Sequence, residues 1–428
     1  MQDQGDRRAG TRAGVESAFE TSLGAWENDF GHESGGAREL GVATRVRSGV
    51  GSYIGAGVHV AIGRKVPLLS SVERLYLDHA AITPVVAEAL EAIAQALETI
   101  GNPSSPHADG RVARAALEDA RRTIAEVLEW RHDVILTSGA TEAIQIVASR
   151  AKPERRIVGP TEHEAVVAAM GPDAQALDVD TNGLIDLSAL EGALGGAPAL
   201  VAIQLVNNET GVIQPIERIQ DLVRSAGSLL LCDCAQAAGK IALPEADFIV
   251  ITSQKFGGAP GSGALLVRDL STLEPRGGQE RGYRRGTENL PGIVGMAAAL
   301  ESHAFLEAMP RLKLLREQLE RDIVAAGGLV IGEGAPRIAT IGAYAMPGVA
   351  SASQLVQFDL AGISVSAGSA CSSGSMKPSR VLAAMGVPAE IAGSTVRVSF
   401  GPDTNQSDIS RFLQEWRRIA SRAKVQAA

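Results

Sequence analysis

The stretch ALVAIQLVNNETGVIQPIERIQDLVRSAGSLLLCD (199–233) decides the fold. It begins with an apolar run of strand length, ALVAIQLV (199–206), and continues into PIERIQDLVRSAG (215–227), which has helical periodicity. A second apolar run, LLLCD (229–233), follows directly. A strand, a helix and a strand in this order predict neighbouring parallel strands in a sheet that helices cover on both faces.

The same alternation extends in both directions along the chain. DVILT (133–137) precedes a helical run at 140–150, and DFIVIT (247–252) and GALLVRD (263–269) are further runs of strand length. We therefore predict an α/β protein whose large domain is built on a mostly parallel sheet. The long amphipathic helix RLKLLREQLERDIVAAGG (311–328), with its glycine stop, is expected to open a smaller second domain.

These patterns divide the chain into three segments. Residues 71–307 form the predicted large domain, with the first of them joining the smaller α/β domain at 308–428. Residues 1–70 have weak periodicity and many Gly, Ser, Arg and Glu residues. We expect them to be a poorly ordered extension, with a small docking arm or a start site assigned too early as the alternatives.

The composition excludes several classes of protein. Of 428 residues, 45% are hydrophobic and 21% are charged, which is typical of a soluble globular protein. The net charge of −9 does not favour nucleic acid or an anionic membrane as a partner. No apolar run approaches the roughly 18 residues that span a bilayer. Three cysteines are too few for a disulfide framework, and the N-terminus lacks a secretory signal, so we expect a cytoplasmic protein.

The turn TSGATE (137–142) follows one predicted strand and begins a helix near Ala140. In an open parallel sheet, ligands bind at the carboxyl ends of the strands. Free backbone N–H groups and the helix dipole favour an anion there, and Thr141 adds a hydroxyl donor. The turn is a candidate phosphate site, although such a turn alone is usually only a connection.

Asp233 ends a strongly apolar strand in LCDCAQAAGK (231–240). A carboxylate there needs a cationic partner, and a protonated pyridine nitrogen of a cofactor is one candidate. Gln236 could bond to a hydroxyl of the same ring. A buried Asp that caps a local turn is the alternative. Cys232 and Cys234 point to one face of the strand and are expected to pack in the core rather than bind a metal.

Two further residues carry nucleophilic groups. Lys255 follows a strand in TSQKFGG (252–258), where burial would lower its pKa and let it form a Schiff base. Cys371 lies among Ser, Gly and Ala in SAGSACSSGS (366–375), a context typical of an accessible, reactive thiol on a mobile loop. A solvated surface lysine and a bystander cysteine are the alternatives.

Together these blocks resemble the pyridoxal-phosphate-dependent cysteine desulfurases, which have the type I transferase fold of the class V aminotransferases and feed iron–sulfur cluster assembly. The match spans about residues 75–402 and keeps the order of the family. The blocks that carry it are YLDHAAITP (76–84), GNPSSPHADGR (101–111), TSGATEA (137–143), TEHEAVV (161–167), VNNETGV (206–212), CDCAQAAGK (232–240), SQKFGG (253–258), GGQERGYRRGTEN (277–289), GSACSSG (368–374) and VRVSFG (396–401).

The resemblance implies a role for individual residues. Lys255 would hold pyridoxal 5'-phosphate covalently and then move protons, and Cys371 would attack the sulfur of L-cysteine, keep it as a persulfide and pass it to a protein acceptor or iron–sulfur scaffold. The resemblance also implies that His163 stacks on the cofactor ring and assists proton transfer, that Asp233 pairs with the ring nitrogen, and that Asn208 and Gln236 contact the ring. The cofactor phosphate would be bound by Ala140, Thr141, Thr252 and Gln254, and by Thr287 from the partner chain of a homodimer. Arg397, with Asn208 nearby, would bind the substrate carboxylate.

The sequence departs from the family pattern near the expected cofactor. Gln254 stands where the family usually has His before the Schiff-base lysine, and Thr252 stands where Ser is common. His79 and Ile82 interrupt the usual Asn-Ala-Ala-Thr-Thr-Pro block. Because glutamine can donate to phosphate but carries no charge, we expect activity to survive with weaker cofactor binding.

Three alternatives remain open from the sequence. A selenocysteine lyase would run the same steps on selenium. An aminotransferase or kynureninase-type enzyme would share Lys255 and Asp233 but need no thiol. A catalytically impaired, desulfurase-like partner protein would keep the fold without turnover.

Overall fold

The computed structural model describes residues 74–98, 101–370 and 376–427. Cys371 and the N-terminal extension expected at 1–70 therefore lie outside the described residues. The boundary expected between residues 307 and 308 stays a prediction.

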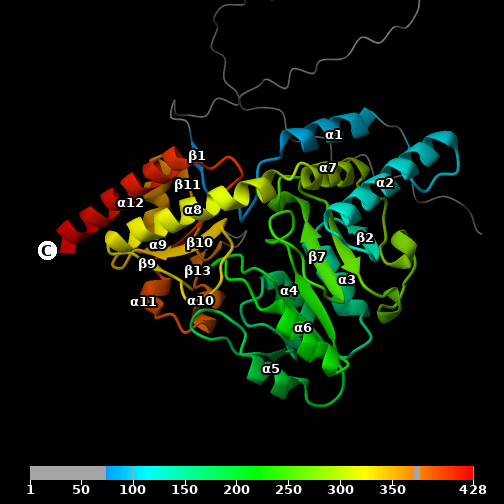
Figure 1. The fold of residues 1–428 in the computed structure, drawn as a ribbon, viewed down its shortest axis with the longest axis horizontal. Helices are drawn as coiled ribbons and strands as arrows, with labels where there is room; N and C mark the ends of the chain where they lie inside the picture. Colours follow the sequence, from blue (N-terminus) through cyan, green and yellow to red (C-terminus); the bar gives the residue numbers. More distant parts are fainter. Residues whose placement is uncertain (1–73, 99–100, 371–375, 428) are drawn as a thin grey trace, which may run out of the picture. The chain divides into compact units, whose positions relative to one another are not determined.

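A seven-stranded sheet forms the centre of the large domain (Figure 1). Its spatial order is β2 (Asp133–Thr137), β8 (Gly263–Val267), β7 (Phe248–Thr252), β6 (Leu229–Asp233), β5 (Ala199–Gln204), β3 (Arg155–Val158) and β4 (Gln175–Ala176). Only β8 runs against its neighbours, β2 and β7, and the other pairs are parallel. The predicted α/β fold with a mostly parallel sheet is confirmed.

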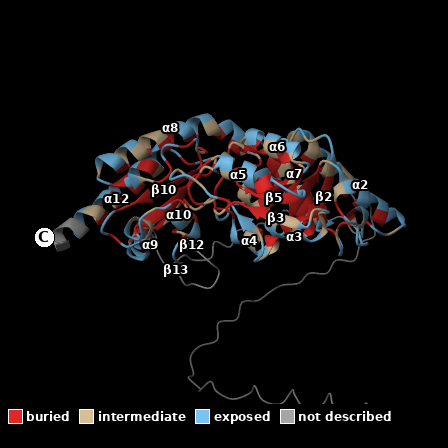
Figure 2. Cartoon of the chain, turned by 90° about the horizontal axis from the view of Figure 1, so that it is seen from below, coloured by how far each residue is buried: buried red, intermediate tan, exposed pale blue. Residues whose placement is uncertain are grey.

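Except in the exposed edge strand β4, successive side chains of each strand enter different cores, because a strand has a period of two residues. On β5, Leu200 and Ala202 pack into one buried cluster, and Val201 and Ile203 pack into the other. The strands therefore lie buried inside a shell of helices whose outer faces are exposed (Figure 2). This burial on both faces explains why the strands appear in the sequence as continuous apolar runs.

The helices divide between the two faces of the large sheet. Helices α3 (Ala140–Arg150) and α4 (Glu164–Met170) bury apolar residues in the smaller cluster. The larger cluster receives side chains from α1 (Ala87–Glu98), α2 (Ala108–Val127), α5 (Leu187–Leu194), α6 (Ile216–Ser225) and α7 (Leu290–Glu301). Helix α7 lies against both α1 and α2 (Figure 1).

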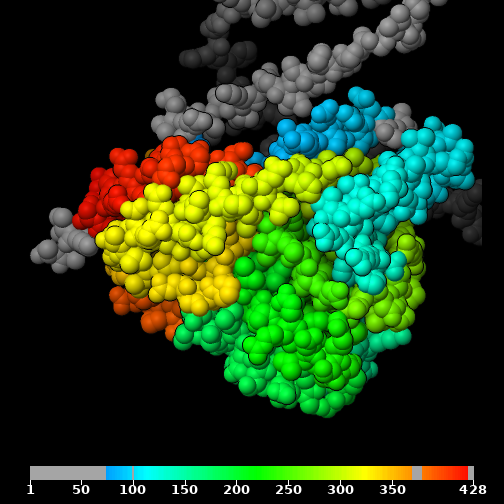
Figure 3. Space-filling model, in the orientation of Figure 1, coloured from blue at the N-terminus to red at the C-terminus, as the bar shows by residue number. Residues whose placement is uncertain are grey.

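A second, antiparallel sheet has the order β14 (Thr395–Ser399), β10 (Ile341–Ala345) and β9 (Leu329–Val330). Helices α9 (Ser351–Leu360) and α12 (Gln406–Ala427) contribute Phe358 and Phe412, whose rings stack with centroids 5.0 Å apart. Helix α8 runs beside α12 on the face shown in Figure 3. The short strand β1 (Leu75–Tyr76) pairs in parallel with β11 (Ile363–Ser364), which follows α9.

Helix α8 (Ala304–Ala325) is the element whose start the sequence pattern misplaces. The expected start at residue 311 is wrong, because the helix continues through Pro310 and begins seven residues earlier, at Ala304. Pro310 lies inside the helix and has no N–H to donate to the carbonyl four residues earlier, and burial of Phe305, Leu312 and Leu315 on either side stabilises the helix across it. The expected glycine stop is confirmed, because Gly327 has a φ of 88° just after the helix.

The remaining elements are short. They are the strands β12 (Ser369–Ala370) and β13 (Met376–Lys377), the helices α10 (Arg380–Ala384) and α11 (Ala389–Ala392), and the single 3-10 turns η1 (Ser253–Lys255), η2 (Leu270–Thr272) and η3 (Glu280–Gly282). Within the described ranges, no helix combines the length and the apolar character that a membrane span requires.

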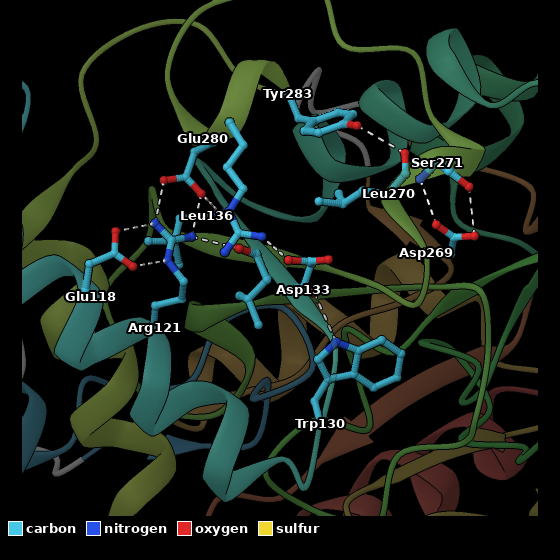
Figure 4. Close-up of polar contacts among 12 residues, drawn as sticks. Glu118, Arg121, Trp130, Asp133, Leu136, Asp269, Leu270, Ser271, Glu280 and Tyr283 are labelled. Atoms are coloured by element: carbon cyan, nitrogen blue, oxygen red, sulfur yellow. Dashed lines mark hydrogen bonds and ion pairs between the residues drawn. The ribbon is translucent and has the colours of Figure 1, made fainter.

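A buried ion pair closes the free edge of the large sheet at β2 (Figure 4). The guanidinium of Arg121 donates to both carboxylate oxygens of Glu280, at 2.6 and 2.8 Å. Arg121 also donates to the Val134 carbonyl, and Glu280 accepts from the Leu136 amide. The pair thus satisfies edge groups of β2 that would otherwise template another strand. It also anchors the segment that continues to Thr287.

Replacing Glu280 with alanine should destabilise the protein, because it leaves Arg121 partly buried without this partner and leaves the Leu136 amide unbonded. We expect the free energy of unfolding to fall by about 3 kcal/mol, measured by urea titration. The matched control is Asp119→Ala, which removes a pair with Arg122 in which both side chains are more than half exposed. The control should change stability little. Equal effects of the two substitutions would contradict this account.

Candidate active site

A cavity of about 750 Å³ opens at the carboxyl ends of the large sheet's parallel strands. The sequence-predicted site residues that line it are Ala140, Thr141, His163, Asn208, Asp233, Gln236, Thr252, Gln254, Lys255 and Arg397. Thr287 is not part of the cavity lining in the described chain, and Cys371 lies outside the described residues. The structure thus brings together nearly all the side chains that the sequence singled out.

The register of the sheet explains this convergence. Gln204, the last residue of β5, lies opposite Asp233, the last residue of β6. Asp233 in turn lies opposite Val250 on β7, two residues before the end of that strand. Neighbouring strands therefore end nearly level, and Lys255 follows β7 within a single 3-10 turn.

The amine of Lys255 is directed at the backbone of the segment that follows β1. Its Nζ donates to the Ala80 carbonyl at 2.9 Å and to the Ala81 carbonyl at 2.5 Å. Burial, assisted by the positive charge of Arg397, lowers the pKa of Lys255 from 10.5 to about 8. About a tenth of this amine is therefore neutral, and hence nucleophilic, at pH 7.

Asp233 is buried at the end of β6, where its Oδ1 accepts from the Ala235 amide at 2.9 Å. Burial raises the pKa of this carboxyl, whereas the Ala235 bond and the positive charge of Lys255 lower it. The ring of His163 caps α4 and accepts from the Ala165 amide at Nδ1. In the neutral ring the proton therefore resides on Nε2.

A candidate anion site lies where β2 passes into α3. Gly139, with a φ of 150°, makes no side-chain cap, so the first amides of this eleven-residue helix stay available for a ligand. Thr252 lies beside this turn, and its hydroxyl donates to the Gln254 side-chain carbonyl at 2.5 Å. That bond leaves the amide N–H groups of Gln254 free to donate, so the turn offers neutral donors for a phosphate.

Arg397 enters the cavity from β14 of the smaller sheet. Its Nη2 donates to Asp78 Oδ1 at 2.7 Å, and its Nη1 donates to the Asn208 carbonyl at 3.0 Å. Its Nε is buried and has no hydrogen-bond partner in the described chain. The guanidinium is thus fixed in orientation while donor capacity remains for a carboxylate.

Sequence reasoning missed five carboxyls that line the cavity: Glu142 and Glu164, each in the first turn of a helix, and three others. Asp78 orients Arg397, Glu162 lies buried beside His163, and Glu209 accepts from the Ser379 hydroxyl at 2.6 Å. All three lie inside blocks that match the family pattern. A carboxylate next to an apolar run was the available signal, since burying such a group requires a partner.

A second buried lysine, Lys240, lies outside the cavity lining. Burial and the charge of Lys255 lower its pKa from 10.5 to about 7. Its Nζ lies 5.0 Å from the centre of the Phe305 ring, a cation–π contact. Low basicity alone therefore does not identify the reactive lysine, and access to the cavity distinguishes Lys255.

Thr287 follows the anchored turn η3 and is exposed. Arg284 donates through Nη1 to the Thr287 carbonyl and through Nε to Glu142, which lies in the first turn of α3. These bonds attach the segment to α3, the helix that begins at the candidate anion site. The Thr287 hydroxyl lies outside this chain's own cavity.

Comparisons with known proteins show the family to which the chain belongs. Residues 75–412 match the family model described as "Aminotransferase class-V". The chain is 38% identical to a cysteine desulfurase of Cereibacter sphaeroides, over 80% of this chain and 94% of that protein, and 36% identical to one of Klebsiella pneumoniae, over 82% and 94%. It is also similar to the crystal structure of a NifS-like protein from Rickettsia africae, with a TM-score of 0.75 and 29% identity, over 82% of this chain and all of that one.

The lowered pKa of Lys255 can be measured through its chemical reactivity. Because only the neutral amine reacts, the rate of acylation of Lys255 should rise with pH around a midpoint near 8. The protein is first freed of any aldehyde bound to this lysine, and the modification is measured by peptide mass spectrometry. Asp233→Asn should move the midpoint lower, since the Asp233 charge raises the pKa of this lysine. A midpoint near the ordinary 10.5 would show that the amine is not buried as described.

Proposed function

Because this chain belongs to the class V aminotransferases, and among them to the cysteine desulfurases, we propose that it takes the sulfur atom from L-cysteine and releases L-alanine. The family predicted from the sequence motifs is confirmed. The observation that supports the function best is the meeting of Lys255, Asp233 and Arg397 in one cavity. A selenocysteine lyase or an impaired partner protein is not favoured, because the relatives are cysteine desulfurases.

The cavity fits pyridoxal 5'-phosphate, the cofactor we propose. The Lys255 amine suits its aldehyde, Asp233 suits its ring nitrogen, and the amides at the start of α3 with Thr141 suit its phosphate. Gln236 Oε1 is buried without a hydrogen-bond partner among the described residues, and a ring hydroxyl would donate to it. When bound, this cofactor supplies an electron sink for negative charge at the substrate α-carbon.

The residues of the chain would then bind the substrate and move its protons. Arg397, oriented by Asp78 and the Asn208 carbonyl, binds the carboxylate of L-cysteine. Lys255 Nζ accepts the α-proton, because its lowered pKa keeps part of the amine neutral. His163 lines the cavity, and the proton that it carries on Nε2 is available to donate.

Cys371 is the proposed sulfur acceptor within the chain. Its thiolate attacks the sulfur of L-cysteine, so that a sulfur–sulfur bond forms as the substrate carbon–sulfur bond breaks. The alanine carbon takes a proton, and the outer sulfur stays on Cys371 as a persulfide. A protein acceptor or iron–sulfur scaffold would then take this sulfur by thiol exchange.

We also propose a homodimer in which Thr287 of one subunit binds the phosphate in the other. The exposure of Thr287 outside its own cavity, on a segment anchored by Arg121, Glu280 and Arg284, supports this arrangement.

Replacing Cys371 with serine tests the sulfur transfer. With L-cysteine and a reductant, the wild type should release alanine and sulfide in equal amounts, and Cys371→Ser should lose nearly all of both, because an alcohol is a poor nucleophile towards sulfur. Both products are quantified in one reaction. Cys234→Ser is the matched control, since this thiol is buried outside the cavity. Equal yields from wild type and Cys371→Ser would rule out the persulfide route.

Replacing Gln254 with histidine tests the neutral phosphate site. A histidine that is protonated below about pH 6.5 would add a charged donor, so we expect the variant to bind the cofactor about fivefold more tightly than the wild type at pH 6. The difference should shrink at pH 8, as measured by equilibrium titration of cofactor absorbance. The wild type should still turn over. If the wild type were inactive and only Gln254→His were active, Gln254 would not replace the histidine of the family pattern in function.

A further inference from the structure

A second buried carboxyl, Glu162, lies one strand away from Asp233. Its side chain is only 1% exposed, and its Oε1 accepts from the Gln204 amide at 2.8 Å. Gln204 is the residue of β5 that lies opposite Asp233 on β6. Glu162 therefore reaches from the turn after β3 to the carboxyl end of β5, beside the carboxylate proposed to face the cofactor.

The turn that carries Glu162 is held in place by other bonds. The Gln204 side chain donates to the Thr161 carbonyl at 2.7 Å, and Asn207 donates to the same oxygen at 3.1 Å. Arg380 donates to the backbone carbonyl of Glu162. Since these bonds fix the turn without the Glu162 carboxyl, its second oxygen is not needed for structure.

That second oxygen, Oε2, is buried and has no hydrogen-bond partner in the part of the chain that the structure describes. A carboxylate is strongly disfavoured where one of its oxygens is desolvated and unbonded. Glu162 also lines the cavity, so this oxygen belongs to the same buried environment as Asp233.

The groups around the two carboxyls favour the charged form of Asp233 more than that of Glu162. Asp233 is favoured as an anion by its bond from Ala235 and by the positive charge of Lys255. Glu162 has one amide bond and the charge of Arg380 in its favour, while burial and the negative charge of Asp233 raise its pKa well above the usual range. Ionising both of two nearby buried carboxyls costs more free energy than ionising one, so one of them stays protonated. The proton resides on Glu162, whose anion has fewer stabilising interactions.

We propose that Glu162 and Asp233 act as a carboxyl pair that holds one negative charge, with Glu162 as the protonated, positioning member and Asp233 as the anion. The role of this pair in the protein rests on the proposed function. The single negative charge of the pair would match the single positive charge of a protonated cofactor ring nitrogen. A neutral Glu162 leaves that match undisturbed, and loss of its proton at high pH adds a second, unmatched charge.

Infrared spectroscopy of the full-length protein tests the protonation directly, whether or not cofactor is present. The carbonyl stretch of a protonated carboxylic acid should be present at neutral pH and weaker in Glu162→Gln. In Asp233→Asn, the pH at which the Glu162 band disappears should fall by about one unit, because the repelling charge is gone. Glu209→Gln is the control, since Glu209 is a second buried cavity acid that bonds to Ser379. It should leave that pH unchanged.

The same variants test the coupling to the cofactor through a pH profile. The visible absorption of the loaded wild type should change as Glu162 loses its proton, and Glu162→Gln should lack this step. An acid band that is unaffected by Glu162→Gln, or a pH profile identical in wild type and variant, would overturn the proposal. A protein that never binds the cofactor would refute the proposed function instead, while the infrared result would still decide the state of Glu162.

Discussion

The site depends on keeping a carboxylate and an amine together where water is largely excluded. Asp233 ends one apolar strand and Lys255 follows another, and burial acts against the charged form of each. Each charge supports the other, and the Ala235 amide and the carbonyls of Ala80 and Ala81 supply hydrogen bonds. A rigid sheet is needed to hold these groups, because a small displacement of one would leave the other buried and unpaired.

The two sheets supply different parts of the site. The large parallel sheet positions Asp233, Lys255 and the anion site through the level ends of its strands. The smaller sheet contributes Arg397, which is tied to Asp78 at the start of the described chain across 319 residues of sequence. This ion pair links the proposed substrate-binding guanidinium to the segment whose carbonyls hold Lys255. The proposed binding of a carboxylate at Arg397 would therefore act on the segment that holds the Lys255 amine.

Much of this architecture follows from local sequence, and the remainder follows from contacts between distant segments. The ranges of β2, α3 and β6 match the sequence prediction, because continuous apolar runs and helical periodicity are local signals. The pairing of Asp78 with Arg397 has no local signal. Lys240 and Lys255 are not distinguished by burial, since both have lowered pKa values, and only the folded chain shows that Lys255 alone of the two lines the cavity.

The central claim is that Lys255 holds the cofactor. Reduction of the purified protein with borohydride would fix the cofactor to its lysine, and peptide mass spectrometry would locate it. The account predicts a pyridoxyl group on the peptide that contains Lys255. Finding that group on Lys240, or finding Lys255 unmodified in protein that has bound the cofactor, would contradict it.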